Sequence, residues 1–173
     1  MPWIEPVFDR NEDDVSTATR IISEVNANGY SSLSVEDKAL FDSGLKACRN
    51  YTDLNRIENN CDYLGNILGL SLITDTSWTV SKTPLESDIQ RICDNVDAVK
   101  NAMQSIVPVY IPDVPELPIN TIYKMNAIEE ILYMVDYVYN QMIRWDDLDE
   151  INETWDELDS KQLLWQDYYL KED

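Results

Sequence analysis

The residues of this sequence that could do chemistry are carboxylates and thiols, because the chain contains no histidine. Its densest carboxylate group is Asp146, Asp147, Asp149 and Glu150. Paired carboxylates can perform acid–base catalysis, and several together can bind a cation. These four, however, lie in a charged run typical of a solvated surface, and no glycine follows them as a calcium-binding loop requires. Without imidazole, a Ser–His or Cys–His nucleophile is also excluded.

The three thiols and four glycines form no recognisable motif. Cys48, Cys61 and Cys93 are far apart, and none forms a CxxC pair. We expect them to be small buried apolar groups in a reducing compartment, without a structural zinc ion. No GxGxxG sequence or phosphate-binding loop can be drawn from the glycines. The sequence therefore predicts no catalytic residue, cofactor or metal ligand, and a protein that is not an enzyme.

Acidic residues outnumber basic ones by 33 to 13, which gives a formal net charge of −20. This balance disfavours binding to nucleic acid or to anionic membranes, since both require basic surface. It permits basic protein partners or cations, and it also fits a merely solvated surface. No run of about 18 apolar residues is present, so we expect no membrane span. The N-terminus lacks the basic and apolar regions of a signal peptide.

Hydrophobic periodicity predicts a mainly α-helical fold, a helical bundle with one long heptad helix, an extended N-terminal arm and a Pro-rich extended connection. Three helices are expected in the first part, over about residues 11–26, 34–47 and 52–69. Thr52 or Asp53 is expected to cap the third helix. The predicted parts are an arm with a three-helix module (1–70), an extended loop or small hairpin with the long heptad helix (71–107), a Pro-rich extended strap (108–119), and a helix with a Trp-repeat acidic C-terminal segment (120–173).

The long heptad helix is expected to begin at Thr83 as N-cap, with Pro84 in its first position. Its apolar residues alternate spacings of four and three: Leu85, Ile89, Ile92, Val96, Val99, Met103 and Ile106. The four prolines of the strap exclude a helix there and predict an extended segment of roughly 30 Å. Because this is nearly the length of the heptad helix, the strap could return the chain along it. The fifth helix, predicted from Asn120 to about Arg144, would then lie parallel to the fourth.

A short motif recurs in two of the predicted helices. Leu-Asn-Arg-Ile-Glu at residues 54–58 matches Met-Asn-Ala-Ile-Glu at residues 125–129, an offset of 71. The apolar stripes that follow match at the same offset. Internal pseudo-symmetry would explain this similarity, and so would chance resemblance between two amphipathic helices.

Asparagine is a mediocre helix former, yet three asparagines, Asn55, Asn59 and Asn60, lie within residues 51–64 of the third predicted helix. Asn55, Arg56, Glu58 and Asn59 place directional polar groups beside its apolar stripe. Such groups can fix the register between helices or with a partner chain. The alternative is an exposed face with a local Asp53–Arg56 pair.

Aromatic residues are abundant, with five tryptophans and ten tyrosines. Tryptophan is a favoured interface anchor, although core packing is the ordinary alternative. Three tryptophans recur every ten residues in the acidic C-terminal segment, which predicts either short capped helices or one continuous helix. The aromatic candidates for contact with a partner are Trp3 and Phe8 in the arm, Trp78 in a polar loop, and Trp145, Trp155 and Trp165 in the C-terminal segment.

Two stretches of the chain resemble a module in virion structural proteins of phages that infect Gram-positive bacteria. Those proteins open with W..PVTDRT..DV and continue with a DLNRIE.N..YL helix. Residues 3–15 fit the first motif except at Phe8 and Asn11, and residues 53–64 fit the second. The decad sequence TWDELD at residues 154–159 also resembles Trp-repeat segments of phage tail proteins.

The resemblance implies a tail, baseplate or fibre-associated component of a virion or of a tail-like bacteriocin. Its location would be the particle, and its partners would be neighbouring particle proteins. Self-association through the heptad helix, as a trimer, is a further hypothesis. The alternative from another functional class is an acidic helical inhibitor, or DNA mimic, that binds a basic site on a host protein. The family motifs bring no catalytic residues with them.

Overall fold

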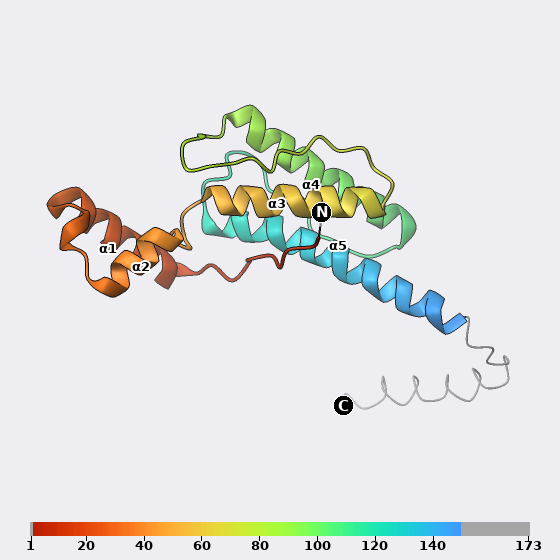
Figure 1. Ribbon diagram of the computed structural model, residues 1–173. Coiled ribbons are helices and arrows are strands. Elements are labelled where there is room, and N and C mark those ends of the chain that lie inside the picture. Colours follow the sequence, from red (N-terminus) through yellow and green to blue (C-terminus); the bar gives the residue numbers. More distant parts are fainter. Residues whose placement is uncertain (1, 150–173) are drawn as a thin grey trace, which may run out of the picture. The chain divides into compact units, whose positions relative to one another are not determined.

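The protein is mainly α-helical, as its hydrophobic periodicity predicts. A computed structural model describes residues 2–149, with the backbone alone for residues 143–149. Within that range there are five α-helices, a short 3-10 helix and no β-strand. The elements are α1 (Glu12–Asn28), η1 (Tyr30–Ser32), α2 (Val35–Ser43), α3 (Tyr51–Ile67), α4 (Glu86–Ile106) and α5 (Ile122–Asp149) (Figure 1).

The chain divides after residue 136 into two units. The first unit, residues 1–136, holds α1 to α4 and the first part of α5. In the second unit, the described residues 137–149 continue α5 as a helix, which extends beyond the predicted end at Arg144. All contacts discussed below lie within the first unit.

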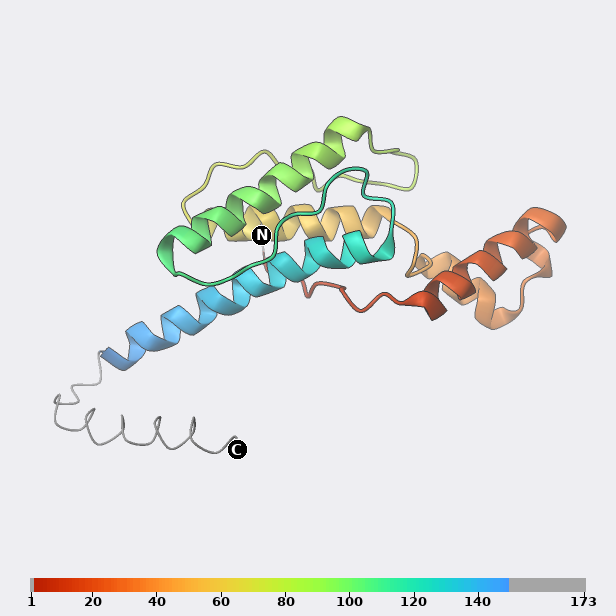
Figure 2. The same cartoon turned by 180° about the vertical axis from the view of Figure 1, so that it is seen from behind.

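The centre of the first unit is a bundle of α3, α4 and the first part of α5. These helices run in the same direction, and the chain returns after each of the first two through an extended segment (Figures 1 and 2). A third extended segment, the N-terminal arm, runs in the same direction as the other two. We name the three extended segments strap 1 (residues 2–10), strap 2 (residues 70–79) and strap 3 (residues 108–119).

The parallel helices bury their apolar stripes against one another. In α4 the five central heptad residues, from Ile89 to Met103, are buried, whereas Leu85 and Ile106 at its two ends are 67% and 54% exposed. The central heptad residues of α4 are therefore buried by other parts of the same chain. Strap 3 contains neither helix nor strand, because its prolines cannot donate the backbone hydrogen bonds that either element requires.

Two predicted helix starts are wrong, and in both cases a carboxylate in the first turn explains the observed start. In α4 the Asp88 carboxylate accepts the N–H of Leu85 at 2.9 Å, which makes Leu85 the N-cap in place of Thr83. In α3 the Asp53 carboxylate accepts the N–H of Asn50 at 3.0 Å, so Asn50 is the N-cap in place of Thr52 or Asp53. An acid three residues after the N-cap satisfies a backbone donor that the helix leaves free.

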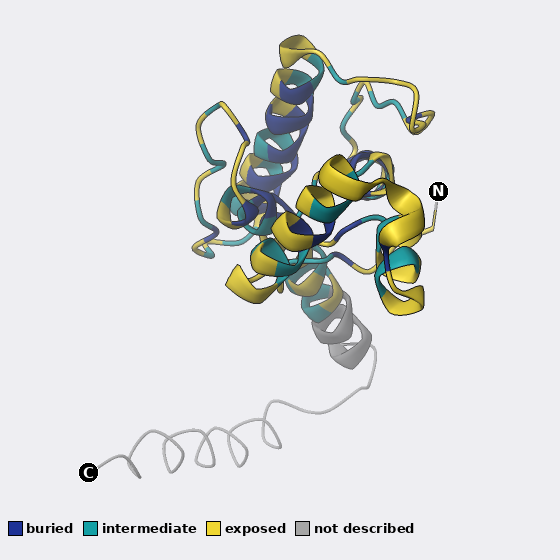
Figure 3. Ribbon diagram, turned by 90° about the vertical axis from the view of Figure 1, so that its left-hand side faces the viewer, coloured by how far each residue is buried: buried dark blue, intermediate teal, exposed yellow. Residues whose placement is uncertain are grey.

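A hairpin of α1 and α2 lies between strap 1 and α3. Asn11 caps α1 by accepting the N–H groups of Asp13 and Asp14 at 2.9 and 3.2 Å. Gly44, at φ +86°, ends α2 at Ser43, earlier than the predicted end near residue 47. The hairpin has a small core of its own, formed by Ala18, Ile21, Leu33 and Leu45. Figure 3 shows that most residues of the hairpin are exposed, whereas the bundle helices carry stripes of buried residues.

Candidate functional site

Polar side chains of the bundle helices lie in the grooves between the helices, where they hold strap 1 and strap 2. On α5, Asn126 and Glu129 grip strap 1. The Asn126 side chain accepts the N–H of Arg10 at 3.3 Å and donates to the Arg10 carbonyl at 2.9 Å. Glu129 accepts the N–H of Val7 at 2.7 Å. These bonds recognise an extended backbone, and they satisfy groups that would otherwise be partly buried without partners.

On α3, Asn55 and Glu58 grip strap 2 in the same way. The Asn55 side chain accepts the N–H of Trp78 and donates to its carbonyl, both at 2.9 Å. Glu58 accepts the N–H of Asp75 at 3.0 Å. In each case the asparagine holds one strap residue, and the glutamate one helical turn later holds the residue three positions earlier in the strap. We call each Asn–Glu pair a clamp, the α5 clamp on strap 1 and the α3 clamp on strap 2.

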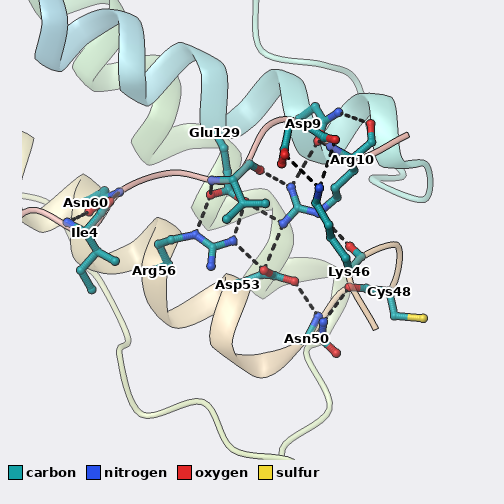
Figure 4. Close-up of polar contacts among 12 residues, drawn as sticks. Ile4, Asp9, Arg10, Lys46, Cys48, Asn50, Asp53, Arg56, Asn60 and Glu129 are labelled. Atoms are coloured by element: carbon teal, nitrogen blue, oxygen red, sulfur yellow. Dashed lines mark hydrogen bonds and ion pairs between the residues drawn. The ribbon is translucent and has the colours of Figure 1, made fainter. Parts of the chain in front are cut away.

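Glu129 of the α5 clamp forms a cluster with three further charged residues, Arg10, Asp53 and Arg56, which we call the Arg10–Glu129 cluster (Figure 4). Arg10 reaches Glu129 at 2.8 Å and Asp53 at 3.0 Å. Arg56 contacts Glu129 at 2.7 and 2.8 Å and Asp53 at 2.6 Å. Glu129 is fully buried and Arg10 is 4% exposed. Two positive and two negative groups thus balance, as burial of charge requires.

The glutamate of the α3 clamp pairs with one arginine, whereas Glu129 pairs with two. Arg91 of α4 forms a two-pronged contact with Glu58, with both N–O distances at 2.7 Å. The indole N–H of Trp78 donates to the same carboxylate at 3.3 Å. The pKa of Arg91 is raised above its usual value, chiefly by its hydrogen bonds to Glu58. For Arg56, burial acts to lower the pKa, but its bonds to Glu129 and Asp53 outweigh burial and raise it.

A second asparagine supports strap 1 and strap 2 from the neighbouring helix. Asn60 of α3 accepts the N–H of Ile4 at 3.0 Å and donates to its carbonyl at 2.7 Å. Asn95 of α4 donates to the Ile73 carbonyl at 2.9 Å. The pairs Arg56–Asn60 and Arg91–Asn95 therefore occupy equivalent positions, 35 residues apart in sequence.

The three bundle helices share one pattern of buried residues in aligned segments. The aligned segments are Asp53–Leu64 of α3, Asp88–Val99 of α4 and Lys124–Val135 of α5, at successive offsets of 35 and 36. The four apolar positions of each segment are buried in all three helices: Leu54, Ile57, Cys61 and Leu64; Ile89, Ile92, Val96 and Val99; Met125, Ile128, Leu132 and Val135. Each bundle helix is preceded in sequence by a strap. Only α3 is separated from its strap, because the α1–α2 hairpin lies between strap 1 and α3.

The third groove, between α4 and α5, lacks the polar clamp. Gln90 and Cys93 of α4 stand where α3 has Asn55 and Glu58. Ala127 of α5 stands where α3 has Arg56 and α4 has Arg91. Strap 3 crosses this groove beside Gln90 and Cys93, where a hollow of about 360 Å³ remains. Since prolines replace four of the N–H donors of strap 3, a glutamate clamp would have fewer groups to accept.

The structure thus places the predicted interface residues as follows. Asn55, Arg56, Glu58 and Asn59 bind other segments of their own chain; Asn59 donates to the Pro2 carbonyl at 2.7 Å. Trp78 is 2% exposed and belongs to the core. Trp3 and Phe8 are half-buried against Tyr63 and Tyr133, with ring centroids 5.6 and 5.2 Å apart. Trp145 lies in α5 where only the backbone is described, and Trp155 and Trp165 lie outside the described residues.

The sequence did not single out five residues that complete these sites. The missed residues are Asn60, Arg91, Asn95, Asn126 and Glu129, and Arg10 entered only through the resemblance. The [LM]NxIE motif contained Asn126 and Glu129 and could have identified both. Arg91 and Asn95 could have been found by testing an offset of 35, at which RIxxN recurs in α3 and α4.

The environments of the three cysteine thiols disfavour reactivity. Cys61 and Cys93 are buried, and Cys48 is half-buried. Burial raises the pKa of all three thiols, so the reactive thiolate form is disfavoured at neutral pH. In the part of the chain that the structure describes, no three His, Cys, Asp or Glu side chains are grouped so that they could hold a metal ion.

Comparisons with protein-family models, with curated proteins and with solved structures found no match to this chain. None of the helices within residues 2–149 is long and apolar enough to cross a membrane.

Proposed function

We propose that this chain is a structural component of a phage tail or tail-like particle, near the baseplate or the fibre attachment, and that it acts through protein–protein contacts. The observation that carries the proposal is that the two stretches resembling the virion module bind each other. Arg10 from the first stretch pairs with Asp53 of the second at 3.0 Å, and Trp3 packs against Tyr63 with the two rings tilted by 52°. The motif residues therefore maintain a folded module, which is the role expected of an architectural protein.

The same contacts favour an architectural role over a catalytic one. The charged side chains with the deepest burial, Arg10, Glu58 and Glu129, are all engaged in ion pairs at 2.7–2.8 Å. A catalytic acid or base needs a route to substrate and a pKa suited to proton transfer. These groups instead tie straps to helices, and the bundle would act as a rigid spacer or adaptor between neighbouring subunits.

The decisive experiment is a mass-spectrometric inventory of particles purified from the host that carries this gene. We expect the chain in intact particles, in constant ratio to other tail proteins across independent preparations. If the chain is abundant in the lysate but missing from the particles, the proposal is wrong.

The net charge of −20 supports a second candidate, an acidic inhibitor that occupies a basic site on a host protein. In the same experiment, affinity-tagged chain recovered from infected cells distinguishes the two functions. Recovery of a host nucleic-acid enzyme, together with absence from the particles, would select the inhibitor.

A further inference from the structure

One edge of strap 2 is bound to the bundle and the other is not. The carbonyl of Ile73 accepts from Asn95 and from Arg91, at 2.9 and 3.0 Å. The N–H of Asp75 binds Glu58. In an extended chain the N–H and C=O of successive residues point to opposite edges. The edge that carries the backbone groups of residues 73 and 75 therefore faces the floor of the groove.

The opposite edge presents the backbone groups of Leu72 and Thr74. Within residues 2–149, neither residue has a backbone hydrogen bond to another described part of the chain. The edge ends at Asp75, whose side chain accepts the N–H of Ser77 at 2.9 Å and turns the backbone. Leu72 and Thr74 thus offer two N–H donors and two carbonyl acceptors at the spacing of a β-strand.

The three straps differ in how their edges are protected. Prolines and charged residues on an edge prevent another strand from pairing with it. Strap 1 is bonded to the bundle along both edges, through Ile4 and Val7, and strap 3 contains four prolines, whereas strap 2 has a free edge and no proline. Residues 70–74 of strap 2, Leu-Ser-Leu-Ile-Thr, are also uncharged and rich in residues found in strands. Among three equivalent segments, strap 2 alone keeps an unprotected edge.

The surroundings of this edge indicate which segment would fit it. The Ile73 side chain is 77% exposed beside the edge. A hollow of about 400 Å³ next to it is lined by Leu72, Ile73 and Asp94, among others. The two nearby basic side chains are already paired, Arg91 with Glu58 and Lys82 with Asp75. An apolar contact beside an acidic group therefore favours a strand that carries both a β-branched and a basic residue.

We propose that the free edge of strap 2 binds an extended segment of a neighbouring particle protein, which adds to it as a second strand. The segment supplies the N–H and C=O partners of Leu72 and Thr74, an apolar side chain against Ile73 and a lysine or arginine near Asp94. Main-chain pairing of this kind gives affinity, and the side chains give specificity. A second copy of this chain is disfavoured as the occupant by its charge of −20. The inference rests on the proposed function, because it names the surface through which the chain would join the particle.

The test compares Thr74→Pro with Thr74→Ala. Proline removes the outward N–H and leaves the inward bonds of Ile73 and Asp75 in place, while alanine keeps the N–H and removes only the side chain. Particles would be assembled with each variant supplied in place of the natural chain, and incorporation measured by quantitative mass spectrometry. We expect incorporation of Thr74→Pro to fall about tenfold relative to Thr74→Ala, the size expected for a lost donor to a buried acceptor. Equal incorporation of two folded variants would overturn the inference.

Hydrogen exchange on the natural chain tests the inference without relying on a variant. In the isolated protein, the amides of Leu72 and Thr74 should exchange rapidly, whereas those of Asp75 and Trp78 should be protected. In purified particles, a peptide spanning residues 71–75 should gain protection. If the chain is present in particles and this peptide gains none, the inference fails while the proposed function stands. If the chain is absent from particles, the proposed function itself fails.

Cross-linking identifies the occupant. A photoreactive residue in place of Ile73 should capture, in intact particles, a peptide of another particle protein that contains a basic residue. Capture of a second copy of this chain, or of an acidic peptide, would show that the assigned occupant is wrong.

Discussion

The grooves on either side of α5 hold equivalent straps through different backbone groups. Between α5 and α3, strap 1 is held by charge and by side-chain amides that bind its backbone. Between α5 and α4 the Asn–Glu clamp is missing, and strap 3 is bound through its carbonyls instead. These carbonyls accept from Lys124 and Gln104, and Asp113 of the strap pairs with Lys100 at 2.9 Å. An extended segment with free N–H groups must have them satisfied when it is buried, whereas a segment with four prolines has fewer groups to satisfy.

The difference shows that the clamp and the composition of the strap belong together. A glutamate in a groove is favourable only when arginines balance it and strap amides donate to it. In the third groove Ala127 replaces the arginine and Cys93 replaces the glutamate, so both members of the pair are absent. The predictions below separate the two solutions by measuring what each contributes to stability.

The largest effect is expected for Glu129→Gln. This change keeps the shape of the side chain but leaves Arg10 and Arg56 buried with only Asp53 to balance them. Removing one partner from a buried ion pair costs about 3–5 kcal/mol. Urea unfolding followed by circular dichroism should show this loss in the free energy of unfolding.

The matched control for that change is Glu130→Gln, an exposed neighbour on the same helix turn. It should leave the unfolding midpoint unchanged. A similar midpoint for both variants would mean that the Arg10–Glu129 cluster does not stabilise the fold.

Glu58→Gln should have a smaller effect, about 2–3 kcal/mol, because Arg91 is partly exposed and water can solvate it when the pair is broken. Trp78 should become more accessible, since its indole N–H loses a charged acceptor. Iodide quenching of fluorescence would detect this change. Unaltered quenching combined with unaltered stability would show that strap 2 is held without the carboxylate.

Next in size are the two asparagines that hold strap backbones. Asn126→Ala and Asn55→Ala each remove two hydrogen bonds to a strap and should each cost about 1–3 kcal/mol. Amide exchange at Arg10 should accelerate only in the first variant, and exchange at Trp78 only in the second. Gln90→Ala in the third groove is the control, and it should change neither. Acceleration at both straps in either variant would show that the grooves are not independent.

Much of this architecture follows from the sequence, because apolar spacing determines which helix faces are buried. The mainly helical character and the five helices could be anticipated from residue types alone. The start of α4 could not, because Leu85 is a residue that propensity disfavours as a cap and it depends on the Asp88 carboxylate. The start of α3 could not be assigned either, because Asn50, Thr52 and Asp53 are all suitable caps and only the Asp53–Asn50 hydrogen bond selects Asn50.

Only part of the clamp pattern could be recognised in the sequence. The offset of 71 between Asn55 and Asn126 identified the two helices that contain both Asn and Glu. The equivalent positions of α4 hold Gln90 and Cys93, so the motif does not identify α4. Which strap each asparagine holds depends on contacts between residues more than 20 or 100 positions apart, such as Asn55 with Trp78 and Asn126 with Arg10. Polar side chains in a helix do not by themselves indicate whether their partner is solvent, another chain or a distant segment of the same chain.

The smallest effect is expected in the third groove, for Pro115→Ala. Pro115 lies in strap 3 and makes no hydrogen bond through its nitrogen, so the change removes no contact of the clamp type. Proline stabilises an extended segment mainly by restricting the unfolded chain, which is worth about 0.4–1 kcal/mol. Urea unfolding should therefore show a loss near this size, with an unchanged dependence of the free energy on urea. A loss as large as that of Asn126→Ala would mean that the proline ring itself anchors the strap. Packing of the proline ring would then stabilise strap 3 as much as a clamp stabilises strap 1. The two grooves beside α5 would differ in the kind of contact but not in its contribution to the free energy of unfolding.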